Sequence, residues 1–340
     1  MTGTLSQLAA GLPAPRPRGR WQRAGRSERL SWQLEALLLR LLLALLRGRS
    51  HGRVAGALQQ VVRLGQPLLG RQLATAEANL ERVYGPELSP EQRRQLARCS
   101  LEQFFLSCLE SIIEPVPAWR IEAEGEGLGQ LLARRRPGEG AIVASLHLGC
   151  WDLALRWLGE RLDNLAVIYR PAHNPLADRL LNRARRANSQ CHWISQFDVR
   201  SMLVWLQRGG TLVVMSDLYG QRHPLAVDVL GLSTLLVRTP LALAQKTAVQ
   251  LFPVAHVRDD DGRFRVICGR PLPPADRAEA LIPRAQALAD WQEPWIQAYA
   301  EQSYWIQRRW RSGDGSGSRL RPPAAPAPRA LAAAAARGRH

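Results

Sequence analysis

The sequence predicts an α/β fold with a mostly parallel central sheet flanked by helices, preceded by an N-terminal helical region that contacts a membrane. Across residues 141–269, short apolar runs alternate with helix-like segments, which is the pattern of a parallel sheet with crossover helices. Residues 30–110 begin with a leucine-dense run and continue with helical periodicity. The 340 residues are 46% hydrophobic, which is enough for a sizeable core.

Four regions follow from composition. Residues 1–29 are rich in Pro, Gly and Arg and are expected to form a disordered basic arm. Residues 30–110 form a helical region for membrane association and packing, and residues 111–311 form the α/β domain. The end of the chain, 312–340, is a low-complexity tail that we expect to be disordered.

The segment LSWQLEALLLRLLLALL at 30–46 is expected to be a helix lying in the membrane interface. It is interrupted by Glu35 and Arg40 and is shorter than the ~20 apolar residues that a spanning helix needs. An ordinary core helix would have a similar composition. Further along, Ser89 before Pro90 is typical of a helix N-cap.

Five apolar runs are predicted to be buried strands, at residues 141–146, 165–170, 211–217, 250–257 and 263–269. Helices are expected between them, at residues 151–162, 174–188, 199–209 and 239–248. The DDDG at 259–262 is typical of a hairpin turn, so the last two strands should be an antiparallel edge pair.

The charge balance is strongly basic, with 46 Lys+Arg against 29 Asp+Glu and a formal net charge of +17. Such an excess favours a polyanionic partner, namely nucleic acid, an anionic membrane surface or a phosphorylated substrate. High genomic GC content would enrich arginine in the same way. The five cysteines are widely spaced and form no C-x-x-C pair, which favours a reducing cytoplasm over a disulfide framework or a zinc site.

His147 is the strongest candidate for chemistry. It lies in ASLHLGCWDLA, directly after a predicted buried strand, where sites form in α/β sheets. Asp152 follows five residues later at the head of a predicted helix, where it could accept a hydrogen bond from Nδ1 and orient His147 as a base. The same spacing recurs, but only His147 combines a preceding buried strand with a glycine, Gly149, that permits a tight turn. The other pairs are His173/Asp178, His223/Asp228 and His256/Asp261.

HLGCWD resembles the H-x4-acid motif, HX4D, of the lysophospholipid acyltransferase superfamily, and it is especially similar to the late lipid A biosynthesis (lauroyl/myristoyl) acyltransferases. Further segments resemble that family in the same order over about residues 70–311: AEANLERVYGPELSPEQRR, VIYRPAHNPLADRLLNRARR, SDLYG and YWIQRRWR. The sequence departs from the family at Asp152, where close relatives have Glu, and at Cys150, where Asn is common. The segment VLGLSTLLVRTP also lacks the family's usual Gly-bearing stretch.

The resemblance implies a glycerolipid acyltransferase-like fold and transfer of a fatty acyl group from an acyl thioester, on acyl carrier protein or CoA, to a hydroxyl of a membrane lipid. A lipid A precursor or another glycolipid would be such an acceptor. His147 would act as the base and Asp152 would orient it. The thioester is a co-substrate, and neither a cofactor nor a metal is expected. The implied location is the cytoplasmic face of the inner membrane, with peripheral or monotopic attachment to an anionic surface.

Residues at other strand ends are candidates for substrate binding. Arg170 ends a strand in YRP, and its guanidinium suits a phosphate of the acceptor, although a solvated loop arginine would read the same. Asp217 also ends a strand, where it could position the acceptor or cap a loop. Gly149 completes the expected substrate-binding set. The closing aromatics could sit at a membrane boundary or on a surface helix. These are Tyr304, Trp305 and Trp310.

Three alternatives stay open. A nucleic-acid-binding protein is suggested by charge alone, but no helix-turn-helix, zinc-finger or RNP-type pattern is present, so no nucleic-acid partner is expected. A lipid hydrolase is possible, although the chain has no G-x-S-x-G elbow of a serine enzyme. A catalytically inactive relative that only binds lipid would be recognised by loss of the histidine or the acid, and here both are present.

Overall fold

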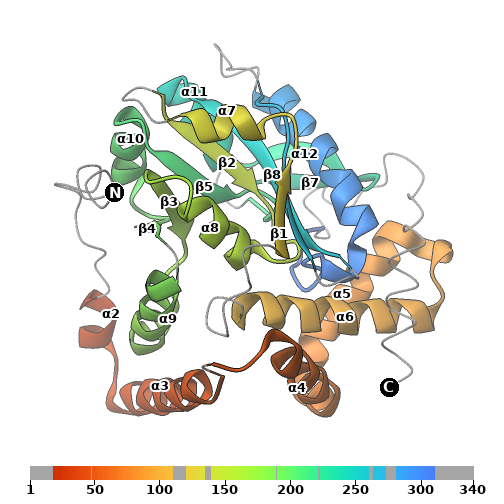
Figure 1. The fold of residues 1–340 in the computed structure, drawn as a ribbon. Helices are drawn as coiled ribbons and strands as arrows, with labels where there is room; N and C mark the ends of the chain where they lie inside the picture. The colour runs from red at the N-terminus through yellow and green to blue at the C-terminus, as the bar shows by residue number, and fades with distance from the viewer. Residues whose placement is uncertain are drawn as a thin grey trace.

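A seven-stranded sheet with helices on both faces forms the centre of the molecule, as the computed structural model shows (Figure 1). The structure describes residues 18–46, 48–109, 120–134, 139–188, 190–220, 223–259, 263–272 and 281–310. The predicted α/β class with a mostly parallel sheet is confirmed. Most of the predicted basic arm and of the C-terminal tail lies outside the described residues.

The strands of the sheet are ordered β1-β9-β8-β2-β5-β3-β4. Their bounds are β1 Ile121–Glu124, β2 Ala141–Ser145, β3 Leu165–Tyr169, β4 His192–Ser195, β5 Thr211–Met215, β8 Gln250–Arg258 and β9 Phe264–Cys268. Neighbouring strands are parallel, except for β8 and β9, which are antiparallel as predicted. The turn expected to join these two falls largely on residues 260–262, outside the described residues.

Three strand segments were not predicted. The edge strands β1 and β4 have four residues each, and β1 has alternating half-buried and exposed positions that include two glutamates. Such short and partly polar edge strands have little apolar signal. The third segment is a separate antiparallel pair, β6 Leu225–Val229 with β7 Leu232–Leu236. Of this pair, β7 lies within the stretch VLGLSTLLVRTP, in which the sequence departs from the family pattern.

Helices precede the sheet and alternate with its strands. The N-terminal ones are α2 Arg18–Arg23, α3 Arg26–Leu46, α4 His51–Leu64, α5 Gln66–Tyr84, the 3-10 turn η1 Gly85–Glu87 and α6 Pro90–Leu109. Those of the α/β part are α7 Leu128–Ala133, α8 Trp151–Gly159, α9 Pro175–Asn188, α10 Val199–Gln207, α11 Thr239–Thr247, α12 Leu281–Ala298 and the 3-10 turn η4 Ala300–Gln302. The four predicted crossover helices are therefore confirmed. Ser89 caps α6 as predicted, because its hydroxyl accepts from the Gln92 N–H at 3.2 Å while Gln92 Oε1 accepts from the Ser89 N–H at 2.8 Å.

The two faces of the sheet bury different layers. Alternate residues of a strand point to opposite faces, so Ile142 and Ala144 of β2 join a core built with the helices α5, α6 and α10–α12. Ala141 and Val143 join a second core with α7 and α8. Burial on both faces explains why the central strands read as unbroken apolar runs.

Helix α3 is apolar on the side that faces away from the protein. It packs beside α9, with Trp32 and Ala36 buried, and its Glu35 accepts a hydrogen bond from Asn174 at 2.8 Å. Seven of its leucines are 42–68% exposed: Leu30, Leu34, Leu37, Leu38, Leu41, Leu42 and Leu45. Among the described residues, no helix has the length and apolar character required to cross a bilayer.

Candidate active site

The loop between β2 and α8, residues 146–150, holds His147. Protein groups fix the loop backbone, since Leu148 forms a β-bridge with Ser303 and the Gly149 N–H donates to the carbonyl of Gln302 at 3.1 Å. The His147 side chain is 19% exposed, so solvent reaches part of the ring. His147 therefore lies, as predicted, at the carboxyl end of a buried central strand.

Asp217 is the carboxylate that contacts the His147 ring. Its Oδ1 lies 2.9 Å from His147 Nδ1, and its Oδ2 accepts a hydrogen bond of 2.8 Å from the His147 backbone N–H. A carboxylate at Nδ1 favours the tautomer with the hydrogen on that atom. The lone pair is then on Nε2, which is the atom able to take a proton from a substrate.

The pairing of two neighbouring strands brings these residues together. Ser145 of β2 is in register with Met215 of β5, and His147 and Asp217 each follow two residues later. Ser216 reinforces the junction, because its N–H and its hydroxyl both donate to the Ser145 carbonyl, at 2.7 and 2.9 Å. Both strands were predicted, and the carboxyl ends of adjacent parallel strands share one edge of a sheet. That adjacency is the signal from which the pair could have been found.

Asp152 does not take the place that the spacing predicted. It lies in the first turn of α8, it is 6% exposed, and its Oδ2 is 3.9 Å from Nε of Arg185 on α9. The predicted hydrogen bond from Nδ1 to Asp152 is therefore wrong, because β5 presents Asp217 to Nδ1 and to the backbone N–H of His147 at once. The participation of Asp152 in catalysis stays a prediction.

The environment of Asp217 keeps its carboxyl group ionised. Burial alone would raise its pKa, but the charge and the hydrogen bonds of His147, together with the charge of Arg309, outweigh burial and lower the pKa below its ordinary value. An ionised Asp217 can stabilise the imidazolium that forms when His147 accepts a proton. The pair is thus electrostatically suited to general-base chemistry.

Aromatic rings enclose the imidazole. The ring of Tyr304 lies 5.2 Å from that of His147, and the ring of Trp151 lies 5.6 Å from it in an edge-on arrangement. Phe104 of α6 stacks on Tyr304 at 4.8 Å and touches Trp151 at 5.8 Å. Burial raises the pKa of Tyr304, so its hydroxyl keeps its proton. The sequence did not identify Phe104 as a site residue, because its contact with His147's neighbours depends on how α6 crosses the sheet edge.

The closing segment 304–310 packs into the protein. Trp305 and Trp310 are each 3% exposed, and the Trp305 ring lies 5.9 Å from that of Tyr84 on α5. Their expected position at a membrane boundary is therefore wrong. The segment, including Arg309, instead forms one wall of a pocket that His147 and Asp217 also line.

A comparison with protein families matches the chain over residues 36–312 to the family described as bacterial lipid A biosynthesis acyltransferase. The chain belongs to this family. The match takes in the C-terminal half of α3, the helices α4 to α6, every strand that the structure describes, the His147 loop and the whole closing segment. Membership identifies the protein as an acyltransferase and confirms the resemblance found in the sequence. A comparison with curated proteins finds no match.

Within this lipid A acyltransferase fold, Gly149 has a conformational role. Its φ of +57° is in the left-handed region, and a Cβ at this position would collide with the carbonyl oxygen of His256. The protein engages both of its backbone polar groups, because its N–H donates to Gln302 and its carbonyl accepts from Arg258 at 3.2 Å. The expected binding of substrate by Gly149 stays a prediction.

Arg170 directly follows β3 and is exposed, so its guanidinium is accessible to a ligand. Strand β3 is the parallel neighbour of β5, which places Arg170 at the same edge of the sheet as His147 and Asp217. The location fits the predicted contact with an acceptor phosphate, which itself stays a prediction.

Proposed function

We propose that this acyltransferase moves a fatty acyl group from an acyl thioester to a hydroxyl of a membrane lipid, with His147 as the general base. The observation that carries the proposal is the two-point contact of Asp217 with Nδ1 and the backbone N–H of His147. That contact supports Nε2 of the partly exposed ring as the proton acceptor.

The proposed reaction requires no acyl-enzyme. Nε2 of His147 removes the hydroxyl proton of the acceptor as its oxygen attacks the thioester carbonyl. The tetrahedral intermediate then collapses, the carbon–sulfur bond breaks, and the imidazolium returns the proton to the departing thiolate. An ester and a free thiol are the products. Asp217 holds the ring and stabilises its charged form.

The donor is proposed to be an acyl thioester of acyl carrier protein or CoA, which serves as co-substrate, so the step consumes no other cofactor. The acceptor is proposed to be a lipid A precursor or another glycolipid. Arg170 would bind an acceptor phosphate through its guanidinium. Asp152 is proposed to act on the site electrostatically, from its position beside Arg185.

Mass spectrometry of total lipids, with and without the protein, tests the proposed acceptor class. Cells that lose the protein are expected to lack a glycolipid species and to accumulate the same species short by one acyl chain. A plasmid with the wild-type gene should restore it, and one encoding His147→Ala should not. An unchanged glycolipid profile, with altered free fatty acids instead, would contradict the proposal.

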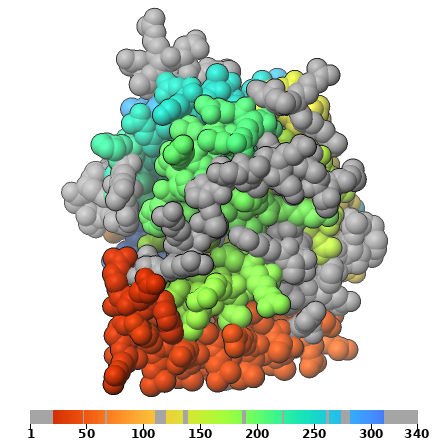
Figure 2. All heavy atoms as spheres, turned by 90° about the vertical axis from the view of Figure 1, so that its left-hand side faces the viewer, coloured from red at the N-terminus to blue at the C-terminus, as the bar shows by residue number. Residues whose placement is uncertain are grey.

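The exposed leucines of α3 support attachment of the protein to a membrane through its N-terminal helices. Figure 2 shows the N-terminal helices as a continuous band, coloured red to orange, along the lower edge of the molecule. Exposed apolar residues continue into α4 and α5 at Val61, Leu64 and Leu68. Such a face is stabilised by insertion to the depth of the headgroups, while neighbouring arginines such as Arg40 contact anionic lipid. We propose peripheral attachment to the cytoplasmic face of the inner membrane.

Replacing Leu34, Leu38 and Leu41 by glutamine is expected to lower the partition coefficient onto anionic vesicles by about tenfold or more. Each leucine side chain that is transferred from water into the membrane contributes ~1.5–3 kcal/mol to binding. Co-sedimentation with vesicles of phosphatidylglycerol and phosphatidylethanolamine measures the effect. The control is Ile282→Gln, which changes a side chain on α12 that is 53% exposed. Equal binding of the triple variant and the control would remove α3 as the membrane contact.

A further inference from the structure

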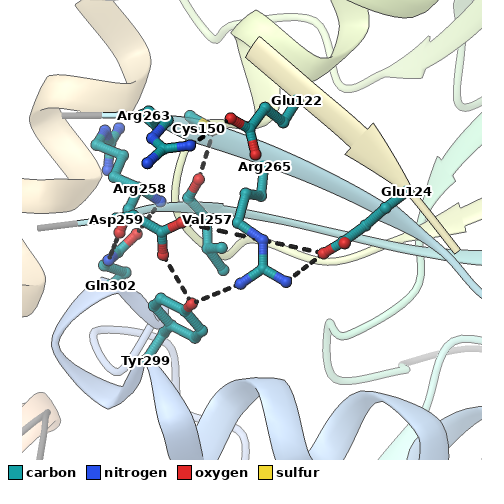
Figure 3. Close-up of polar contacts among 10 residues, drawn as sticks. All are labelled: Glu122, Glu124, Cys150, Val257, Arg258, Asp259, Arg263, Arg265, Tyr299 and Gln302. Carbon is teal, nitrogen blue, oxygen red and sulfur yellow. Dashed lines mark hydrogen bonds and ion pairs between the residues drawn. The ribbon is translucent and has the colours of Figure 1, made fainter. Parts of the chain in front are cut away.

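Strand β8 contacts the catalytic loop through consecutive residues. His256 and Arg258 are two positions apart and therefore lie on the same face of the strand, with exposures of 1% and 8%. His256 Nδ1 lies 2.5 Å from the Leu148 carbonyl, and its Nε2 lies 2.8 Å from the Ser145 hydroxyl. Cys150, at the far end of the loop, places its Sγ 3.6 Å from the Val257 carbonyl (Figure 3).

Arg258 links the loop to helix α6. Its Nη1 donates to Oε1 of Gln103 at 2.7 Å, and its Nη2 donates to the Ser107 hydroxyl at 2.7 Å and to the Gly149 carbonyl at 3.2 Å. Gln103 and Ser107 are buried one turn apart on α6, at 7% and 0% exposure. The guanidinium therefore joins two buried side chains of α6 to the backbone two residues after His147.

Gln302 holds the main chain of Arg258 in place. Its Oε1 accepts from the Arg258 N–H at 2.9 Å, and its Nε2 donates to the Arg258 carbonyl at 2.8 Å, as Figure 3 shows. The carbonyl of Gln302 accepts in turn from the Gly149 N–H. Both backbone polar groups of Gly149 are thus fixed by this one arrangement. Its N–H donates to Gln302, and its carbonyl accepts from Arg258 and from the Ser107 hydroxyl, which Arg258 itself contacts.

We propose that Arg258 is a positioning residue for His147, an inference that rests on the proposed role of His147 as the base. Arg258 reaches the reaction only through the loop. By fixing the Gly149 carbonyl against α6, it fixes the backbone N–H and the ring of His147 against Asp217. A displacement of about 1 Å at such a site can lower the rate by ~100-fold.

A matched control lies beside the neighbouring strand β9. Figure 3 shows Arg263, which directly precedes β9, and Arg265 of β9 directed to Glu122 and Glu124 of β1. The Arg263–Glu122 pair is 2.7 Å long, and its partners are 53% and 51% exposed. Exposed pairs of this kind contribute little to structure, so Arg263→Met should behave as wild type.

The experiment compares Arg258→Met, Arg258→Gln and Arg263→Met as full-length purified proteins. Circular dichroism and thermal melting give the folded fraction, and kcat is expressed per folded molecule. The Arg258 variants are expected to lose about 10–100-fold in kcat with little change in KM. Proton NMR gives a readout independent of activity, namely the downfield ring N–H resonance of His147 hydrogen-bonded to Asp217, assigned by its absence in His147→Gln.

The proposal predicts that this resonance is present in the wild type and in Arg263→Met, and is lost or broadened in both Arg258 variants. An unchanged resonance, or a kcat within about threefold of wild type, would overturn it. Failure of both Arg258 variants to fold would also count against it, because Arg258 would then serve the fold alone. An inactive wild type would refute the proposed function, while the resonance would still decide the role of Arg258.

Discussion

Replacing His147 by alanine is expected to lower kcat by about 10²–10⁴-fold while the protein folds normally, because the substitution removes the group that takes the acceptor's proton. Release of free thiol from the acyl donor, followed in the presence of a lipid acceptor, measures the rate. The ring is partly exposed, and alanine keeps the hydrogen bond from the main-chain N–H of residue 147 to Asp217, so we expect only a small change in melting temperature.

His173→Ala is the matched control for this prediction. His173 also has an aspartate five residues later, Asp178, but its side chain is 77% exposed and lies 3.6 Å from Glu28 on α3. The control should retain the wild-type rate. Comparable rates for His147→Ala and His173→Ala would show that the H-x4-D spacing carries no catalytic role in this chain.

The second large effect is expected at Asp217. Asparagine at this position preserves the size of the side chain but removes the negative charge that stabilises the imidazolium, so kcat should fall by about 10²–10⁴-fold. The loss of kcat in Asp152→Asn should be smaller than that in Asp217→Asn by a factor of about ten or more, because Asp152 lies beside Arg185 and does not hold Nδ1 of His147. Both variants are compared in the thiol-release assay at saturating donor.

This comparison separates two mechanisms. A larger loss of kcat in Asp217→Asn supports the His147–Asp217 pair at the ends of β2 and β5. A larger loss in Asp152→Asn, with Asp217→Asn near the wild type, would return the orienting role to the acid of the H-x4-D motif. The ring N–H resonance of His147 should disappear in Asp217→Asn and persist in Asp152→Asn.

Most of the sheet could be predicted from the sequence because its central strands are buried on both faces. Residues 141–144 of β2 and 212–214 of β5 are apolar and buried, and helices with their own periodicity separate the strands. The short edge strands β1 and β4 lack this pattern. They are formed by pairing with β9 and β3, and the partner of β1 lies more than 140 residues further along the chain, as the pair Ile121 and Phe264 shows.

The site was only partly predictable. His147 could be identified from its place after a buried strand, and Asp217 was recognised as a strand-end residue. Spacing along the chain favours Asp152 as the partner of Nδ1, whereas the register of β2 with β5 brings Asp217 to that atom. Adjacent parallel strands bring residues 70 positions apart into contact at 2.9 Å.

The sequence around His147 does not show which aromatic residues enclose the site. Phe104 and Tyr304 come from α6 and from the segment after η4, and they meet at His147 only once both pack on the sheet edge. The composition of the aromatic and basic closing segment therefore predicts a membrane edge, whereas Trp305 and Trp310 are buried in the protein. The role of Arg258 also has no local signal in the sequence, because Gln103 and Ser107, which it contacts, are more than 150 residues away along the chain.

Thiol release by the wild-type protein, measured with and without a lipid acceptor, is the most direct test of attack by an acceptor hydroxyl activated by His147. The donor is an acyl thioester of acyl carrier protein or CoA, and the lipid product is quantified in parallel. We predict negligible thiol release without acceptor and one acylated lipid per thiol when acceptor is present. Thiol release at the same rate without acceptor, accompanied by free fatty acid, would contradict this mechanism and identify a thioester hydrolase.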